Sequence, residues 1–187
     1  MEMEVKVRLP EDMSLNDVLL KLSRLGYSLI DEREEHDIYI DLTSCPNVGR
    51  DVAVRLRLTY RKGRLVGGEL TYKGPRLDRD VKLREEIAVG INDPLKLALI
   101  VSRLGFNTFK VVKSRWILAD GEGLKVFLDD VKGLGRFIEL ELISPKSKRH
   151  FLDKVRGILK ALELEGSKLI TRSYLEMLLG VTEDAEV

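Results

Sequence analysis

The sequence has a single cysteine, Cys45, and no hydrophobic stretch that approaches the ~18–20 residues of a membrane-spanning helix. One thiol excludes a disulfide framework and is compatible with a reducing compartment. Glu2, Glu4 and Lys6 interrupt the apolar run that a signal peptide needs. We therefore expect a soluble, cytoplasmic protein that has no membrane partner.

An excess of charge of either sign is also absent, although charged residues are abundant. The chain contains 32 Lys and Arg against 31 Asp and Glu, so its formal net charge is only +1. Charged residues make up 34% of the chain, above the ~25% typical of soluble proteins, whereas aromatic residues make up 6%. This balance argues against a nucleic-acid partner, which is recognised by a basic surface and by exposed aromatic rings.

Length and composition favour one domain. The chain has 187 residues, of which 44% are hydrophobic, and this is sufficient for a substantial core. We expect a single domain over residues 1–180, followed by a short C-terminal tail, residues 181–187.

Capping residues, apolar stripes and closing glycines predict four helices. These run from Ser14 to Gly26, from Asn92 or Asp93 to Gly105, from Ser144 to about Gly166, and from Ser173 to Leu179. Elsewhere the hydrophobic pattern changes to a period of two, which is typical of strands. The predicted strands are residues 2–9, 36–42, 52–60, 66–73, 82–91, 109–119, 124–130 and 136–143. Similar segments at residues 22–27 and 101–106 indicate two halves, each built as strand, helix and further strands.

Most predicted strands have one apolar face and one face of long charged side chains. Arg55 and Arg57 alternate with Leu56, for example, and Glu139 and Glu141 share one face of another strand. The charged face could meet water, as in an open sheet, or the sheet could close with this face inward. Because burial of a charge costs several kcal/mol per ion, an inward face requires ionic guests. Phosphate oxygens suit the Arg and Lys side chains, and a hard cation suits the carboxylates.

Eight short motifs in order along the chain resemble the CYTH superfamily, also called triphosphate tunnel metalloenzymes, and are closest to its CyaB branch of class IV adenylyl cyclases. They are Glu2-x-Glu4-x-Lys6, Asp37-x-Tyr39, Arg55-x-Arg57, Thr71-Tyr72-Lys73-Gly74-Pro75, Arg84-Glu85-Glu86, Lys113-x-Arg115, Leu128-Asp129-Asp130-Val131 and Glu139-x-Glu141. The resemblance implies an α+β fold in which a closed eight-stranded antiparallel β-barrel forms a tunnel with a charged interior and helices packed outside.

The resemblance also implies roles for individual residues. The phosphate-binding residues would be Lys6, Arg55, Arg57, Lys73, Arg84, Lys113 and Arg115. The metal ligands, for Mg²⁺ or Mn²⁺, would be Glu2, Glu4, Glu86, Asp129, Glu139 and Glu141. Alternation with Arg84 favours Glu86 over Glu85 as the inward carboxylate, although a bulge would exchange them. Tyr39 and Lys73 are the candidate catalytic residues.

We therefore expect an enzyme that hydrolyses a triphosphate, such as inorganic triphosphate, thiamine triphosphate or ATP. One alternative is a CyaB-type adenylyl cyclase, which converts ATP to cyclic AMP and diphosphate. Another is a non-catalytic module that binds polyphosphate or nucleotide, although such a module gains nothing from paired carboxylates. The resemblance is also compatible with a homodimer.

Overall fold

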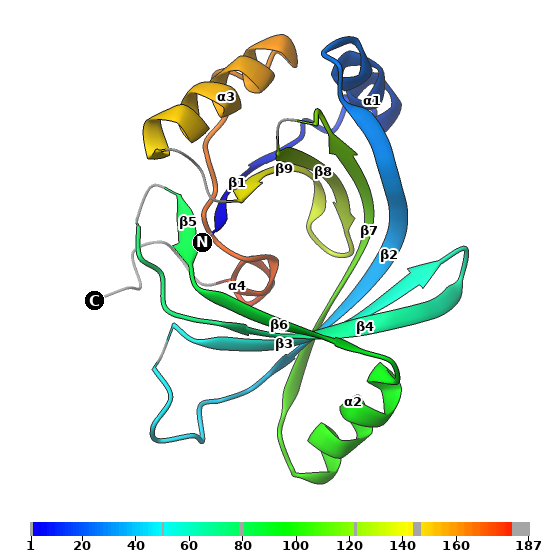
Figure 1. Cartoon of the computed structure of the whole chain (residues 1–187), viewed down its shortest axis with the longest axis vertical. Coiled ribbons are helices and arrows are strands. Elements are labelled where there is room, and N and C mark those ends of the chain that lie inside the picture. The colour runs from blue at the N-terminus through cyan, green and yellow to red at the C-terminus, as the bar shows by residue number, and fades with distance from the viewer. Residues whose placement is uncertain (1, 50, 79–80, 122, 144–146, 181–187) are drawn as a thin grey trace.

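A computed structural model describes residues 2–49, 51–78, 81–121, 123–143 and 147–180, and omits the side chain of Glu2. The described residues form nine strands and four helices (Figure 1). In chain order these are β1 (Glu2–Arg8), α1 (Leu15–Arg24), β2 (Ser28–Ile40), β3 (Ala53–Arg61), β4 (Arg64–Lys73), β5 (Lys82–Arg84), β6 (Glu86–Ile91), α2 (Pro94–Arg103), β7 (Thr108–Ala119), β8 (Leu124–Val131), β9 (Gly135–Ile143), α3 (Lys148–Ala161) and α4 (Tyr174–Leu178).

The strands form one antiparallel sheet that curls into a ring. Its order is β5-β1-β9-β8-β7-β2-β3-β4-β6. The two end strands, β5 and β6, are separated in the chain only by Glu85, so the chain itself joins the two edges of the sheet. The predicted strand over residues 82–91 is thus interrupted once, and its two parts pair with β1 and β4 respectively. With these parts counted as one strand, the eight-stranded antiparallel barrel is confirmed.

The two predicted halves are visible in the strand order. In each half a first strand and a helix precede a three-stranded meander, which is β2-β3-β4 in one half and β7-β8-β9 in the other. The first strand of each half pairs with the last strand of the other half, since β1 pairs with β9 and β6 pairs with β4. This exchange, together with the β2–β7 pairing, holds the halves in one barrel.

Three predicted boundaries are wrong, one of them the end of α3, which lies at Ala161 rather than near Gly166. Strand β2 begins at Ser28 rather than at residue 36, because charged residues on both faces of its first part conceal the period of two. Helix α3 begins at Lys148 rather than near Ser144, because the Ser147 hydroxyl caps it by accepting a 3.1 Å hydrogen bond from the His150 N–H. Residues 144–146 and the predicted tail, 181–187, lie outside the described residues. No helix in the described part of the chain is long and apolar enough to span a membrane.

The main hydrophobic core lies outside the barrel wall. Helices α1 and α3 pack against the outer face of β1, β8 and β9, where residues such as Val5, Val126, Leu140 and Phe151 are fully buried (Figure 1). This packing turns the opposite, charged face of the same strands toward the barrel interior.

A second apolar cluster fills one end of the barrel interior. The inward residues Tyr39, Val111 and Phe137 pack there against Ile170 and Tyr174, next to and within α4. The Lys6 N–H donates to the Ile170 carbonyl at 3.1 Å and the Ile170 N–H donates back at 2.8 Å, which ties this segment to β1. Helix α4 consequently covers one end of the barrel.

We predict that Gly68→Ala destabilises the barrel. A Cβ atom at this position would lie 2.5 Å from the carbonyl oxygen of Arg57 and 2.6 Å from Cβ of Pro94, between β3 and α2. Because backbone cannot easily yield, we expect a loss of about 1–3 kcal/mol in the free energy of unfolding, measured by chemical denaturation. Gly90→Ala on the adjacent strand is the matched control, since no atom lies within 4 Å of its Cβ position. Equal effects of the two changes would contradict this account.

Candidate functional site

The barrel encloses a cavity of about 720 Å³ with a strongly ionic wall. Ten Lys or Arg side chains and nine Asp or Glu side chains line it among the described residues. The charged faces of the strands therefore point inward, and the alternative of a solvent-facing charged sheet is wrong.

All seven predicted phosphate-binding side chains line this cavity. They are Lys6, Arg55, Arg57, Lys73, Arg84, Lys113 and Arg115. Each is buried, and together they come from five strands, β1, β3, β4, β5 and β7. The Nε atoms of Arg55 and Arg84 are buried without a hydrogen bond among the described residues, so these donors remain available to an anion.

The predicted carboxylates divide into two groups. Glu4, Glu86, Glu139 and Glu141 line the cavity, and Glu85 is exposed, so the alternation argument selected the correct neighbour. Asp129 is fully buried but does not line the cavity. Only the backbone of Glu2 is described, opposite Ile143 of β9, and its side chain lies outside the described residues.

Asp129 supports Arg115 from the inward face of β8, where Tyr174 covers it. Its two carboxylate oxygens accept hydrogen bonds of 2.7 and 2.6 Å from the Arg115 guanidinium, and one of them also accepts a 2.7 Å bond from the Tyr174 hydroxyl. Two parallel bonds to one carboxylate fix the plane of a guanidinium. Asp129 therefore orients Arg115 in this structure.

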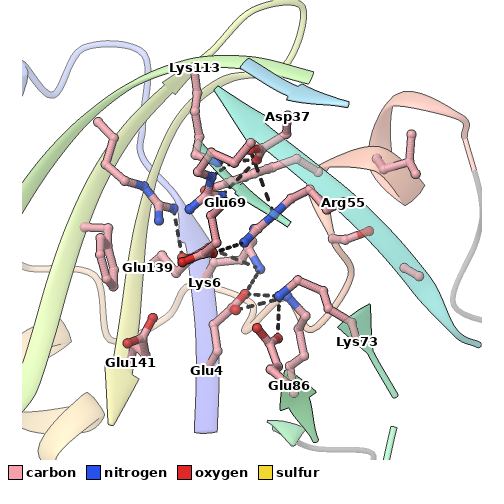
Figure 2. Close-up of a pocket in the computed structure, with 18 of the residues that line it drawn as sticks. Glu4, Lys6, Asp37, Arg55, Glu69, Lys73, Glu86, Lys113, Glu139 and Glu141 are labelled. Carbon is pink, nitrogen blue, oxygen red and sulfur yellow. Dashed lines mark hydrogen bonds and ion pairs between the residues drawn. The ribbon is translucent and has the colours of Figure 1, made fainter. Parts of the chain in front are cut away.

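Cations already neutralise the carboxylates of the cavity wall (Figure 2). The Lys6 ammonium lies 2.5 Å from Glu4 and 3.5 Å from Glu139, and Arg115 lies 2.9 Å from Glu139. Lys73 and Glu86 form a further ion pair. Burial alone would raise the pKa of Glu4, but the nearby positive charges, led by Lys6, hold that pKa well below its usual range.

The carboxylate side chains of β1 and β9 are chemically suited to bind a hard divalent cation. Glu4 and Glu141 face each other across the β1–β9 pair, and Glu139 is opposite Lys6 in the next inward position. Carboxylate oxygens are the ligands that Mg²⁺ and Mn²⁺ prefer. Within the described residues, however, no group of three metal-ligating side chains is close enough to hold an ion. The ammonium groups of Lys6 and Lys82 both lie beside Glu4, so a cation bound here would have to displace at least one of them.

Two buried carboxylates on β2, Glu35 and Asp37, were not predicted as site residues. Asp37 accepts hydrogen bonds of 2.7 and 2.9 Å from Arg57 and 2.9 Å from Lys113. Glu35 lies 2.9 Å from Lys113 and 3.1 Å from Arg57. These pairs hold two phosphate-binding candidates in place. The spacing Glu35-x-Asp37-x-Tyr39 indicates that these three side chains share one face of a strand. The predicted strand began at residue 36, however, and so left out Glu35.

Lys82 and Tyr174 were also missed. Lys82 donates two 3.0 Å hydrogen bonds to Glu4, and its alternation with Arg84 could have revealed its inward direction. The Tyr174 ring lies 5.3 Å from the Lys6 ammonium and 5.6 Å from that of Lys113. The sequence predicts this short helix from its capping residue, but a helix of five residues is too short for a periodic pattern to show which side chain points into the barrel.

The two candidate catalytic residues differ in protonation. Burial and the charges of Arg55 and Lys82 lower the pKa of Lys73 to about 8, so a fraction of this amine is neutral near pH 7–8. Burial, followed by the nearby Asp37 charge, raises the pKa of Tyr39 to about 12. Tyr39 therefore keeps its proton and can donate a hydrogen bond, whereas Lys73 can also accept a proton.

The fold and the cavity define an antiparallel barrel with an ionic interior. The CYTH domain model matches residues 1–174, and the chain belongs to the CYTH domain family. Putative adenylate cyclase MJ0240 from Methanocaldococcus jannaschii is 33% identical over 94% of this chain and 97% of its own.

Solved structures share the fold. The PH1819 protein from Pyrococcus horikoshii is 33% identical, with a TM-score of 0.73 over 96% of this chain and 99% of its own. A Hippeastrum protein, described as a putative adenylyl cyclase with a dominant triphosphatase activity, is 18% identical. Its TM-score is 0.63, over 96% of this chain and 94% of its own, and at this identity it supports the fold alone.

We predict that Asp37→Asn destabilises the protein, because it leaves Arg57 and Lys113 buried with less counter-charge. Removal of one partner of a buried ion pair costs about 3–5 kcal/mol, and we expect a loss in this range by chemical denaturation. Glu34→Gln on the same strand is the control, since this half-exposed carboxylate pairs only with His36 among the described residues. A loss below about 1 kcal/mol for Asp37→Asn would contradict the role assigned to this carboxylate.

Proposed function

We propose that the protein is an enzyme that hydrolyses a triphosphate bound inside the barrel. The observation that carries this proposal is the convergence of seven buried cationic side chains from five strands on one cavity. A single orthophosphate could contact only a few of them, whereas a chain of three phosphates can contact most of them at once. Arg binds phosphate oxygens through paired N–H groups, and Lys binds them as a point charge.

Hydrolysis requires an attacking water and neutralisation of charge on the phosphate. Water attacks the terminal phosphorus, the bond from that phosphorus to the bridging oxygen breaks, and the rest of the substrate leaves as a diphosphate, while the terminal group becomes orthophosphate. Arg55, Arg57 and Arg115 stabilise the negative charge of the equatorial and leaving oxygens. The neutral fraction of Lys73 accepts a proton from the attacking water, and the Tyr39 hydroxyl donates a hydrogen bond that orients it.

The carboxylates of the wall support a divalent metal as part of this proposal. Glu4, Glu139 and Glu141 are the residues that would hold Mg²⁺ or Mn²⁺, with Glu2 and Glu86 as further ligands. Asp129 becomes a ligand only if it releases Arg115 and Tyr174. The bound metal would supply positive charge to the phosphate oxygens and allow Lys6 to turn toward the substrate.

Adenylyl cyclase activity is the second candidate, favoured by the name of the M. jannaschii relative at 33% identity. In this reaction the ribose 3′-hydroxyl attacks the α-phosphorus of ATP and diphosphate leaves. The same cations can serve both reactions, because both develop charge on a triphosphate. The two differ in which phosphorus lies beside the nucleophile.

Product analysis decides between these reactions. Purified protein is incubated with ATP, thiamine triphosphate or inorganic triphosphate, each with Mg²⁺ or Mn²⁺ or with a chelator, and the products are separated by chromatography. We expect orthophosphate that depends on the metal. Cyclic AMP with diphosphate would overturn hydrolysis in favour of cyclisation. Tight binding without turnover would overturn both and leave a non-catalytic binding module.

A change at Glu139 separates an enzyme from a binding module. We predict that Glu139→Gln lowers kcat at least about 100-fold. The change removes the negative charge that pairs with Arg115 and that would bind the metal. A binding module should instead hold inorganic triphosphate as tightly or more tightly, since the variant loses a negative charge. Calorimetry with that anion measures the affinity, and Glu34→Gln on the outside of β2 is the matched control. Unchanged turnover would remove Glu139 from the reaction.

A further inference from the structure

One of the phosphate-binding candidates, Arg84, is held by a loop instead of a strand. Among the described residues, the other candidates all form their ion pairs with carboxylates on the strands of the barrel. Arg84 pairs with Asp51, which lies in the loop between β2 and β3, at 3.4 Å from Nη2 to Oδ1. The sheet fixes a carboxylate on a strand, whereas the position of a carboxylate on a loop depends on its other contacts. The direction of Arg84 therefore depends on what holds Asp51.

Arg76 holds Asp51 from a second loop, the one between β4 and β5. The Arg76 backbone N–H donates a 2.6 Å hydrogen bond to Asp51 Oδ2, and the Arg76 Nε atom lies 3.6 Å from Oδ1. The second loop is fastened to the barrel, because the Leu77 N–H donates a 2.8 Å hydrogen bond to the carbonyl of Leu83 on β5. Asp51 thus lies between Arg76 and Arg84, each of which comes from a different part of the chain.

The Arg76 side chain also reaches α4. Its guanidinium forms an ion pair with Glu176, which caps this helix by accepting a 2.6 Å hydrogen bond from the Ser173 N–H. Burial alone would raise the pKa of Glu176, but the hydrogen bonds from Ser173 and the charge of Arg76 hold that pKa below its usual range. Glu176 is therefore ionised at neutral pH, and the ion pair joins the second loop to α4.

Helix α4 in turn places Tyr174 beside other phosphate-binding candidates. The Tyr174 ring lies 5.3 Å from the Lys6 ammonium and 5.6 Å from that of Lys113. Its hydroxyl donates a 2.7 Å hydrogen bond to Asp129, the carboxylate that orients Arg115. The position of α4 consequently affects these cations as well.

We propose that Asp51 and Arg76 are positioning residues for the phosphate-binding groups. Asp51 directs Arg84 into the cavity, and Arg76 fixes both Asp51 and α4. The charges alternate in sign from Arg84 through Asp51 and Arg76 to Glu176. Arg76 lies outside the cavity-lining set, so it acts through its neighbours. This inference rests on the proposed function and deepens it, because it adds two loop residues to a site whose predicted members all lie on strands.

The first test is Asp51→Ala, for which charge and position predict opposite results. Loss of a negative charge from the cavity lining would strengthen the binding of an anion, whereas loss of the contact that directs Arg84 would weaken it. We expect the dissociation constant for inorganic triphosphate, measured by calorimetry with Mg²⁺, to rise by about tenfold. Asp153→Ala on α3 is the matched control, since it removes the same charge from a side chain that is 57% exposed and outside the cavity-lining set.

The second test is Arg76→Lys, which keeps the positive charge and removes the planar guanidinium. An ammonium group cannot contact Asp51 and Glu176 with the same geometry. We expect the dissociation constant for inorganic triphosphate to rise by about fivefold. Arg156→Lys on α3 is the control, because this guanidinium lies 3.0 Å from Asp153 on the surface.

A double-mutant cycle tests whether Asp51 acts through Arg84. In an Arg84→Gln background, Asp51→Ala should no longer weaken binding, because the side chain that it positions is gone. A merely structural role of Asp51 would weaken binding equally in both backgrounds. Chemical denaturation of each variant checks that the fold is retained.

Three results would overturn the inference. They are unchanged or tighter binding by Asp51→Ala, wild-type affinity in Arg76→Lys, and an undiminished effect of Asp51→Ala in the Arg84→Gln background. Failure of the proposed function looks different, because the wild type would then bind inorganic triphosphate without hydrolysing it. The same dissociation constants still decide the inference in that case. A wild type that binds no triphosphate would overturn both proposals.

Discussion

The barrel depends on the pairing of buried charges with one another. Its inward positions carry cations and carboxylates in nearly equal number, and an unpaired ion there would cost several kcal/mol. Asp37 shows the arrangement clearly, because it accepts hydrogen bonds from both Arg57 and Lys113. These groups come from β7, β2 and β3, which are consecutive in the sheet, so the pairing of the strands itself brings them together. The charged face of the sheet can therefore turn inward because its charges are already paired along that face.

This pairing gives a physical reason for the mixture of charges in one cavity. A bound polyanion must compete with carboxylates for the same cations, so Lys6 cannot contact phosphate fully while it neutralises Glu4 and lies beside Glu139. When Lys6 is drawn away, Glu4 keeps Lys82 and Glu139 keeps Arg115, but each loses one neighbouring positive charge. A divalent cation that entered with the substrate would replace this charge, which relates the proposed metal requirement to the ion pairs of the free protein.

The sequence predicts the parts of this arrangement that repeat with a period of two. Arg55 and Arg57 alternate with apolar residues and were correctly placed on an inward face. The same rule fails at the start of β2, where charged residues on both faces conceal Glu35. It also cannot show that Asp129 is covered by Tyr174 and bonded to Arg115, because alternation identifies a face and not what covers it. Tyr174 depends on the tertiary packing of a very short helix, and no local pattern predicts it.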